Sequence, residues 1–416
     1  MSEYAVTDEL FLWWLGNPRS PVLIGTLHLL RETQGVSLRY SPQWLGSGFA
    51  LSEDLPLTDI EHRPLERGTA AGAVDDAMPD RWGERVIRFL YKPPRLSLLE
   101  YLYFAGDERF GALGVSLSDN AYLPHATGVL PTLADVEEMQ AIVDRILANQ
   151  PVPEEKRRLM APGVTLGGVR PKALITIDGA QWVVKFSERD DAIDTPLVEH
   201  ASMTLAEISG INVAKTRPIK LSRGHAVAVL RFDRAGTAEQ PFRMHAQTAS
   251  VALRAAGEVM GYPELAQLLR RRCRMEGGLA REQMREVFRR MVFNILMDNT
   301  DDHEKNHALL VDDGQYLSLA PAFDVLPTGQ ALGYQQLRVG LDGADSTVDN
   351  ALSQAVLFGI TRGEALRQAG CVAAVCARWK EHFMSKGVTN PDIEFLAQYV
   401  DRETLARQRD DLAAQA

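Results

Sequence analysis

The sequence predicts an α+β protein in which a small α+β domain precedes a two-lobed domain with a β-containing small lobe and a mostly helical C-terminal lobe. Three observations support this prediction. Short apolar runs broken by turn residues fill the first part of the chain. A hairpin pattern follows a proline-marked break at Asn149–Pro153. Beyond Phe242 the apolar residues recur largely at helical spacing.

The small α+β domain is predicted to span residues 1–125. A turn at Gly16-Asn17-Pro18 is followed by predicted strands at Val22–Leu29 and Val36–Tyr40. The pattern between Asp75 and Tyr103 is helical, with four apolar residues on one face: Trp82, Val86, Phe89 and Leu90. The glycine-rich stretch Gly106–Val115 returns to extended chain.

A helical linker over residues 126–155, with its helix at Leu133–Leu147, leads into the small lobe over residues 156–235. There Asp178-Gly179 separates two apolar-rich runs, Lys172–Ile177 and Gln181–Phe186. Asp-Gly between such runs is the strongest short-range hairpin signal. The helical lobe spans residues 236–416, and its clearest helix, Arg281–Met297, carries an apolar stripe that packs against a core.

Composition limits the class of protein. The chain has 416 residues, enough for two or three domains, and 45% hydrophobic with 24% charged residues is ordinary for a soluble globular protein. A net charge of −10 argues against direct binding of nucleic acid by the whole surface. Three cysteines without a C-x-x-C pair fit a reducing cytosol. No signal peptide and no membrane-spanning run is visible, so we expect a cytoplasmic protein without membrane contact.

Two segments of the small lobe have the residues that bind phosphate. The loop Gly163–Lys172 is rich in glycine, which lets backbone N–H groups approach a phosphate. Taken alone, however, it is better explained as a flexible connection before the hairpin. Lys185 lies in an otherwise apolar strand, where a phosphate would offset its desolvation. An edge strand with the lysine in water explains Lys185 equally well.

The helical lobe contributes a polar segment and a lone acid. Asp301 and Asn306 have the D-x-x-x-x-N spacing of a kinase catalytic loop, in which the Asp accepts a hydroxyl proton and the Asn binds Mg²⁺. The packed helix before the segment favours this interpretation over a solvated loop. Asp324 lies in apolar sequence, and a hairpin over residues 307–319 would return it toward Asn306 as a second Mg²⁺ ligand. His303 and His307 form only a weak zinc pair, without an H-E-x-x-H motif.

These segments together resemble the HipA family of bacterial serine/threonine kinases, the toxins of HipA–HipB toxin–antitoxin modules. The matching segments are VTLGGVRPK, WVVKF, LRFDR, NTDDHEKN and LAPAFDVLP, in the family's order. SPQWL, LSEDLPL and GDERFGALGV resemble the family's N-terminal domain. The resemblance covers nearly the whole chain, and it implies a protein-kinase-like fold with ATP and Mg²⁺ as cofactors.

The resemblance also implies roles for individual residues. Asp301 would be the catalytic base, and Asn306 and Asp324 would hold Mg²⁺. The remaining residues implied to bind ATP are Gly167, Gly168, Val169, Arg170, Pro171, Lys172, Lys185, Leu230, Arg231, Phe232, His303, Lys305 and Phe323. Among them, Leu230–Phe232 would be the hinge that meets adenine. Asp233 and Arg234 complete the FDR pattern and are expected to be structural.

Two departures from the family pattern are visible. Thr165 stands where the family's glycine loop has a serine that undergoes inactivating autophosphorylation, so we expect that role for the threonine. Asp302 follows the catalytic Asp where the family often has glycine, and its charge would lower ATP affinity or alter substrate choice.

The partners implied are a HipB-like helix-turn-helix antitoxin, DNA only through that antitoxin, and a protein substrate such as an aminoacyl-tRNA synthetase. Two alternatives remain open: a kinase acting on a small molecule, and a catalytically silent corepressor. The retention of Lys185, Asp301, Asn306 and Asp324 argues against the silent protein. Basic clusters at Arg270–Arg274 and Arg289-Arg290 would touch DNA in such a complex, but a solvated helix face explains them better.

Overall fold

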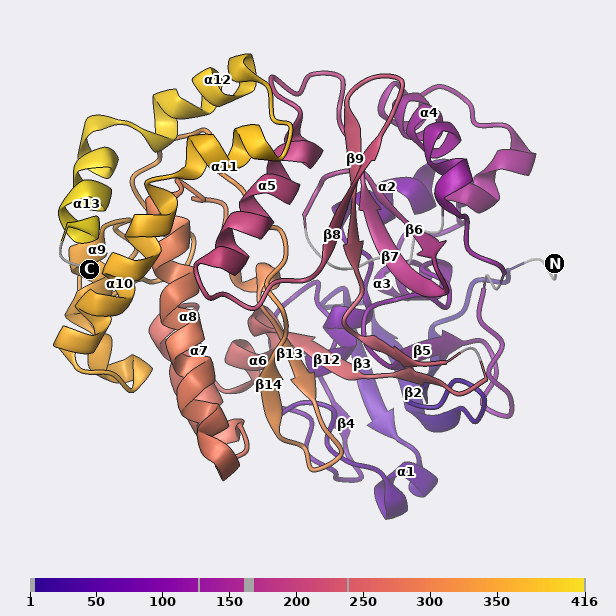
Figure 1. Cartoon of the computed structure of the whole chain (residues 1–416). Coiled ribbons are helices and arrows are strands. Elements are labelled where there is room, and N and C mark those ends of the chain that lie inside the picture. The colour runs from indigo at the N-terminus through magenta and orange to yellow at the C-terminus, as the bar shows by residue number, and fades with distance from the viewer. Residues whose placement is uncertain (1–3, 126–127, 161–167, 238, 415–416) are drawn as a thin grey trace. The chain divides into compact units, whose positions relative to one another are not determined.

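The computed structural model describes residues 4–125, 128–160, 168–237 and 239–414 (Figure 1). The chain divides into two compact units. Unit 1 comprises Met1–Glu188, Leu230–Gln247 and Leu310–Gln315, and unit 2 comprises Arg189–Val229, Thr248–Leu309 and Tyr316–Ala416. The domain boundaries predicted from the sequence stay predictions.

Unit 1 begins with a five-stranded antiparallel sheet in the order β4-β3-β2-β1-β5. Its strands are β1 Glu9–Trp14, β2 Val22–Leu30, β3 Gly35–Tyr40, β4 Glu61–His62 and β5 Leu113–Ser116. Alternate residues of β1, including Leu10 and Leu12, point into the core and are completely buried. The predicted strands at 22–29 and 36–40 therefore lie where the structure has them, whereas only the end of 106–115 is a strand.

Short helices accompany the sheet in unit 1, and the helical pattern predicted between Asp75 and Tyr103 corresponds to several short helical elements. The structure divides it into η1 Gly72–Ala77, α2 Arg81–Val86, the π-helical turn η2 Ile87–Tyr91 and α3 Leu98–Phe104; α1 Pro42–Ser47 lies earlier in the chain. Lys92 adopts a left-handed conformation and two prolines follow it, which ends the helix there. Trp82, Val86 and Leu90 are buried as the spacing predicted, whereas Phe89 is only half-buried.

The rest of unit 1 carries the predicted linker helix and hairpin. Its elements are η3 Leu133–Asp135, α4 Val136–Leu147, η4 Glu154–Leu159, β6 Lys172–Ile177, β7 Ala180–Lys185, β10 Arg234–Gly236, β11 Pro241–Arg243 and β12 His245–Thr248. Asp178 and Gly179 both have positive φ, 50° and 80°, the conformation of a type I′ hairpin turn. The hairpin and its turn are thus confirmed.

Unit 2 is mostly helical. Its elements are α5 Thr195–Ile208, β8 Thr216–Lys220, β9 His225–Leu230, α6 Ala249–Ala255, α7 Tyr262–Arg272, η5 Glu276–Gly278, α8 Leu279–Leu296, η6 Glu304–Asn306, β13 Ala308–Val311, β14 Leu317–Leu319, α9 Val348–Ser353, η7 Ala355–Phe358, α10 Arg362–Cys376, α11 Trp379–Ser385, α12 Asn390–Val400 and α13 Glu403–Ala413. Helix α8 packs against α7 on one side and against α10 on another (Figure 1). It matches the helix predicted over 281–297, and its apolar stripe is buried as expected.

Candidate functional site

The segment that follows α8 carries Asp301 and Asn306 and is held at its start by Asp298. Asp298 is completely buried, has a positive φ of 54°, and forms an ion pair with Arg402 at the start of α13. Its carbonyl oxygen accepts hydrogen bonds from the backbone N–H of Thr328 at 3.1 Å and from the Thr328 hydroxyl at 2.9 Å. The chain therefore leaves the helix at a position fixed from two other parts of unit 2.

Within this segment, neighbouring residues point to opposite sides. Asp301 is exposed, whereas Asp302 and Asn306 are buried. The Asn306 side chain donates a weak hydrogen bond of 3.5 Å to the Asp301 carbonyl oxygen, and the Asn306 N–H donates to the carbonyl of His303 at 2.9 Å. An exposed carboxylate and a buried amide are thus presented by one short, hydrogen-bonded segment, with His303 and Lys305 between them.

Asp302 is 2% exposed, so its charge does not face an open site as the sequence suggested. Its Oδ2 atom accepts hydrogen bonds from the Tyr262 hydroxyl at 2.5 Å and from Nε2 of His307 at 2.7 Å. Burial acts to raise the pKa of Asp302, but the charge and the hydrogen bond of His307, together with the Tyr262 hydroxyl, outweigh it and lower that pKa. The carboxylate therefore stays ionised inside unit 2.

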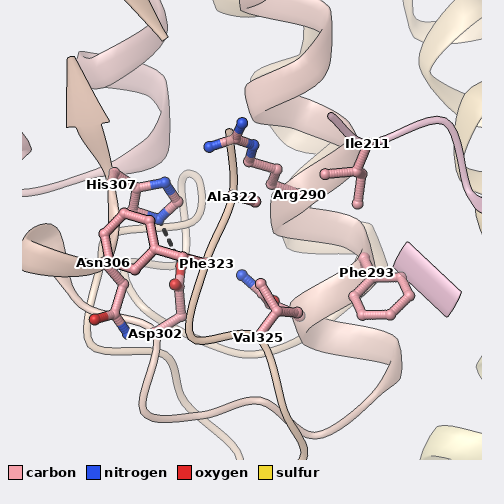
Figure 2. A pocket seen from close by; sticks show the side chains of 10 residues that line it. Ile211, Arg290, Phe293, Asp302, Asn306, His307, Ala322, Phe323 and Val325 are labelled. Atoms are coloured by element: carbon pink, nitrogen blue, oxygen red, sulfur yellow. Dashed lines mark hydrogen bonds and ion pairs between the residues drawn. The ribbon is translucent and has the colours of Figure 1, made fainter. Parts of the chain in front are cut away.

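A cavity of about 10 Å³ lies beside this pair, and ten residues of unit 2 line it: Ile211, Arg290, Phe293, Asn294, Asp302, Asn306, His307, Ala322, Phe323 and Val325 (Figure 2). Figure 2 shows the Asp302–His307 contact as a dashed line. The volume is enough for about one water molecule. Among the described residues, three buried polar atoms of this lining have no hydrogen-bond partner: Asn306 Oδ1, His307 Nδ1 and Arg290 Nη1.

The surroundings of the Asn306 side-chain oxygen indicate whether this segment could bind Mg²⁺. A buried amide oxygen without a partner costs about 1–3 kcal/mol, so its persistence needs a reason. A hard cation that prefers oxygen ligands supplies one. Within the described ranges no group of three or more His, Cys, Asp and Glu side chains is placed to hold a metal ion.

Asp324, the second predicted ligand, follows a segment anchored in unit 2. The backbone of Ala322 bonds to that of Asn212 and Ala214 at 2.8 Å each, and the Arg290 guanidinium donates to the Ala320 carbonyl at 2.8 Å. Asp324 itself has a φ of 58°. Non-glycine residues seldom adopt this conformation, and those that do are frequently found at functional sites. Phe323 lines the cavity together with Asn306.

Arg290 belongs to a basic cluster that was predicted to be a solvated helix face, and its burial contradicts that prediction. It is 3% exposed and bonds to Glu286 at 2.5 Å, so it is not part of a solvated face. Burial lowers its pKa, and the Glu286 carboxylate opposes this effect. In the other cluster, Arg271 pairs with Glu258 at 3.0 Å and Arg274 lies over the Tyr316 ring at 4.7 Å.

In unit 1, two predicted phosphate-contacting lysines face each other across the hairpin. Lys172 and Lys185 are directly paired in β6 and β7, and they are 2% and 5% exposed. Like charges placed opposite each other are destabilising unless an anion is near. Lys172 forms an ion pair with Asp80, the N-cap of α2, and donates to the Gly168 carbonyl at 3.2 Å. The Lys172 ammonium is therefore already balanced by a carboxylate.

Asp233 of the FDR pattern binds the side chain of Arg231, the central residue of the predicted hinge. Both Arg231 nitrogens Nε and Nη2 donate to Asp233, at 2.9 and 2.7 Å, so the Arg231 side chain is directed into a buried cluster. The Arg231 N–H donates to the Gln181 carbonyl at 3.1 Å. Leu230 and Phe232 flank it in the chain. Asp233 and Arg234 are structural in unit 1, as the sequence suggested.

Part of the predicted site lies outside the described residues. Thr165, the predicted autophosphorylation site, and Gly167 fall there, as do Gly163, Val164 and Leu166. Of the glycine loop, only Gly168, Val169, Arg170, Pro171 and Lys172 are described, and Val169 is 56% exposed.

The sequence did not single out Tyr262 or the Asp298–Arg402 pair. Tyr262 lies 40 positions from Asp302, and no local spacing connects them. The sequence analysis gave Asp298 no role, although a polar residue immediately after a long apolar stripe is a signal that the helix end is fixed by a side chain.

Comparisons with known proteins bear on the fold. The model of the HipA-like C-terminal domain matches residues 164–380, and that of the HipA N-terminal domain matches residues 20–116. HipA of Shewanella oneidensis MR-1, solved in a toxin–antitoxin complex with HipB and operator DNA, superposes with a TM-score of 0.68 over 97% of each chain at 20% identity. The predicted α+β fold, with an N-terminal domain ahead of a kinase-like C-terminal domain, is thereby confirmed.

A curated relative is similar over a shorter stretch. The putative kinase Y4dM of Sinorhizobium fredii is 28% identical over 162 residues, which is 36% of this chain and 38% of the relative. The match thus covers less than half of the relative's length. Among the helices of the described residues, none is long and apolar enough to span a membrane.

Proposed function

Because the chain belongs to the family of HipA-like proteins, we propose that it is an ATP- and Mg²⁺-dependent serine/threonine protein kinase. One observation carries the proposal: Asn306 keeps a buried amide oxygen without a partner among the described residues, in the same short segment that exposes Asp301. Phosphoryl transfer needs this combination of a metal ligand and a carboxylate for the acceptor hydroxyl.

Asp301 is the catalytic base in this proposal. Its carboxylate accepts the proton of the substrate hydroxyl while that oxygen forms a bond to the γ-phosphorus of ATP and the bond from that phosphorus to the β–γ bridging oxygen breaks, which releases ADP. The segment that carries Asp301 is fixed by Asp298 and by hydrogen bonds of its own backbone. The carboxylate therefore needs little reorganisation when the acceptor arrives.

Asn306 and Asp324 would hold Mg²⁺, which when bound neutralises the charge that develops on the phosphate oxygens. Lys185 and residues Gly167–Lys172 would contact the phosphates, and the backbone of Leu230–Phe232 would meet the adenine. His303, Lys305 and Phe323 would complete the nucleotide contacts. For Lys172, the ion pair with Asp80 suggests that its ammonium orients the loop through Gly168 more than it binds phosphate.

The biological role follows from the family. We place the chain as the toxin of a toxin–antitoxin module in the cytoplasm, with a HipB-like helix-turn-helix antitoxin as partner and DNA reached only through it. The S. oneidensis HipA in its complex with HipB and operator DNA supports this partner. A translation-related protein such as an aminoacyl-tRNA synthetase is the proposed substrate, and Thr165 is the proposed autophosphorylation site.

The test is incubation of the wild type and the Asp301→Asn variant with γ-labelled ATP and Mg²⁺, alone and with host lysate, followed by phosphosite mapping. We expect label on a lysate protein or on Thr165 with the wild type, and a rate lower by about 10²–10⁴ with the variant, because the proton acceptor is lost. Tight ATP binding without any label would contradict the kinase and favour the silent corepressor. Label found only on small molecules would favour a metabolite kinase.

A further inference from the structure

Asp302 and His307 each stand next to a residue of the proposed catalytic machinery. Asp302 follows Asp301 in the chain, and His307 follows Asn306. Both side chains are 2% exposed and join through a contact of 2.7 Å between Nε2 and Oδ2. The contact joins the two ends of the loop 302–307 in the interior of unit 2, whereas the adjacent Asp301 is exposed. The contact therefore links the two residues that adjoin Asp301 and Asn306 in the chain.

Tyr262 fastens this contact to the helical core of unit 2. Its hydroxyl donates to Asp302 at 2.5 Å, and its ring meets the His307 ring edge-on with centroids 5.7 Å apart. Asn294 of α8 donates to the Tyr262 hydroxyl at 3.4 Å, and Asn299 donates to Asn294 at 3.0 Å. A chain of buried polar contacts thus leads from α8 through Tyr262 to Asp302.

His307 is also tied through its backbone, because its carbonyl accepts the N–H of Ala249 at 2.7 Å where α6 begins. The loop that carries Asp301 and Asn306 is therefore closed by two residues, each of which is fixed to a different helix. Such buried networks hold one geometry because an alternative arrangement would leave a charge unpaired.

We infer that Asp302, His307 and Tyr262 form a positioning clamp that sets the relative placement of the Asp301 carboxylate and the Asn306 amide. The inference rests on the proposed function of those two residues. The clamp residues are positioning residues and not catalytic ones, since they act through their neighbours. A displacement of about 1 Å of a reacting group lowers a rate by about 10²-fold, so we expect a disturbed clamp to lower kcat.

The first test compares Tyr262→Phe with the wild type and with Tyr40→Phe. Tyr262→Phe removes only the hydroxyl that holds Asp302. Tyr40 is the matched control, because it is 3% exposed and its hydroxyl donates to the Leu55 carbonyl at 2.9 Å within unit 1, whereas the catalytic segment belongs to unit 2. We expect Tyr262→Phe to lower kcat per ATP-binding site by about 10-fold and to raise KM for Mg²⁺–ATP by no more than about 10-fold, and Tyr40→Phe to leave both unchanged.

The second test compares Asp302→Ala with Asp302→Asn. The alanine variant removes both contacts, and we expect kcat to fall by about 10²-fold. The asparagine variant keeps an oxygen in place and should restore kcat to within about 10-fold of the wild type. Rates are normalised to the number of ATP sites, so that loss of folded protein does not count as loss of kcat. Values of kcat within twofold of the wild type for Tyr262→Phe and Asp302→Ala would overturn the inference.

A third measurement does not need turnover. ATP affinity is measured by calorimetry with and without Mg²⁺ for the wild type, Asp301→Asn and both clamp variants. We expect the clamp variants to lose about 10-fold of the Mg²⁺-dependent part of the affinity, because Asn306 is displaced, and Asp301→Asn to keep it. If the wild type transfers no phosphate but the clamp variants show this loss, the kinase proposal fails and the clamp stands. If the Mg²⁺-dependent affinity is unchanged in both clamp variants, the clamp is wrong.

Discussion

Two buried polar clusters, one in each unit, differ in how completely their oxygen atoms are satisfied. In unit 1 the Asp233 carboxylate accepts four hydrogen bonds, from Nε and Nη2 of Arg231, from Nη1 of Arg234 and from the N–H of Gly111, all between 2.7 and 2.9 Å. In unit 2 the Asn306 amide is 4% exposed, and its oxygen has no partner within the described ranges.

The residues around Asp233 add further hydrogen bonds and ion pairs to the cluster in unit 1. Arg231 and Arg234 also donate to the backbone carbonyls of Glu108, Arg109 and Gly111. Arg243 pairs with Asp107 at 2.8 Å. Burial acts to raise the pKa of Asp233, but the two arginines outweigh burial and bring that pKa far below its usual range. Burial lowers the pKa of Arg234 to about 10, which still leaves it charged. The Asp233 carboxylate is therefore fully paired, whereas Glu108 Oε2 and Arg234 Nε beside it have no hydrogen-bond partner among the described residues.

This difference in hydrogen bonding indicates which buried group stabilises the fold and which one is able to bind a ligand. A buried group whose lone pairs are all used by the protein stabilises the fold and has nothing left for a ligand. A buried acceptor that the protein leaves without a donor costs stability, and it persists where a ligand completes it. Asp233 is of the first kind, and the proposed function makes Asn306 one of the second, although the sequence presents both as polar residues in short motifs.

The largest effect is expected from Asp233→Ala, which leaves the guanidinium groups of Arg231 and Arg234 buried without their carboxylate. Removing one partner of a buried charge pair costs about 3–5 kcal/mol of unfolding free energy. Denaturant unfolding of wild type and variant measures this loss. Glu381→Ala is the control, because its pair with Arg378 is exposed and is worth less than about 1 kcal/mol. A loss below about 1 kcal/mol for Asp233→Ala would break the comparison.

Asn306→Ala should give the opposite result. We expect phosphate transfer to fall by about 10²-fold, because a metal ligand is lost, with a change in unfolding free energy within about 1 kcal/mol. Asn350 is a matched control in the same unit. It is 1% exposed, its amide group donates to the carbonyls of Gly343 and Asp345 at 3.2 and 3.0 Å, and its oxygen accepts the N–H of Asp342 at 2.9 Å.

Asn350→Ala should therefore lower stability by about 1–3 kcal/mol and leave the rate per folded molecule unchanged. The pair of asparagine variants separates the two effects within one residue type. If Asn306→Ala were the more destabilising variant and kept its activity, the Asn306 oxygen would have a structural partner after all.

The sequence could predict the elements that depend on local patterns. The Asp178-Gly179 hairpin and the α8 stripe follow from turn chemistry and periodicity, and both are present. The helical pattern over residues 75–103 predicted the helical character of this stretch but not its division into short elements, because periodicity does not reveal the left-handed Lys92 before the prolines. Local spacing also predicted Asp301 and Asn306, although no comparison tests their roles.

Contacts between distant residues were beyond sequence reasoning. Tyr262 and Asp302 come together only because α7 packs on α8, and no local pattern at either position predicts the contact. Asp302 was expected to bring charge to the site, whereas the fold buries that charge against His307. Whether a charged residue faces solvent or a partner depends on packing that no single sequence displays.

The smallest expected effect concerns pH, and it sharpens the contrast within unit 1. His245 is 2% exposed, and its Nε2 lies 2.8 Å from the Leu51 carbonyl oxygen. Burial lowers the pKa of His245 from 6.5 to about 4, against the opposing effect of that carbonyl. The unfolded chain therefore binds the proton more readily, so stability is complete above pH 6.5 and falls as the pH drops toward 4, by about 2 kcal/mol.

Asp233 behaves differently because its pKa is lowered from 3.8, so its contribution is complete above pH 3.8 and is lost only below it. Between pH 6.5 and 4 the wild type should lose stability through His245, while His245→Gln, which keeps an N–H donor for Leu51, should lose about 2 kcal/mol less. Unfolding curves at three pH values measure both slopes. Equal slopes for the two proteins would mean that His245 is protonated in the folded state, and that its burial, unlike that of Asp233, is not maintained in solution.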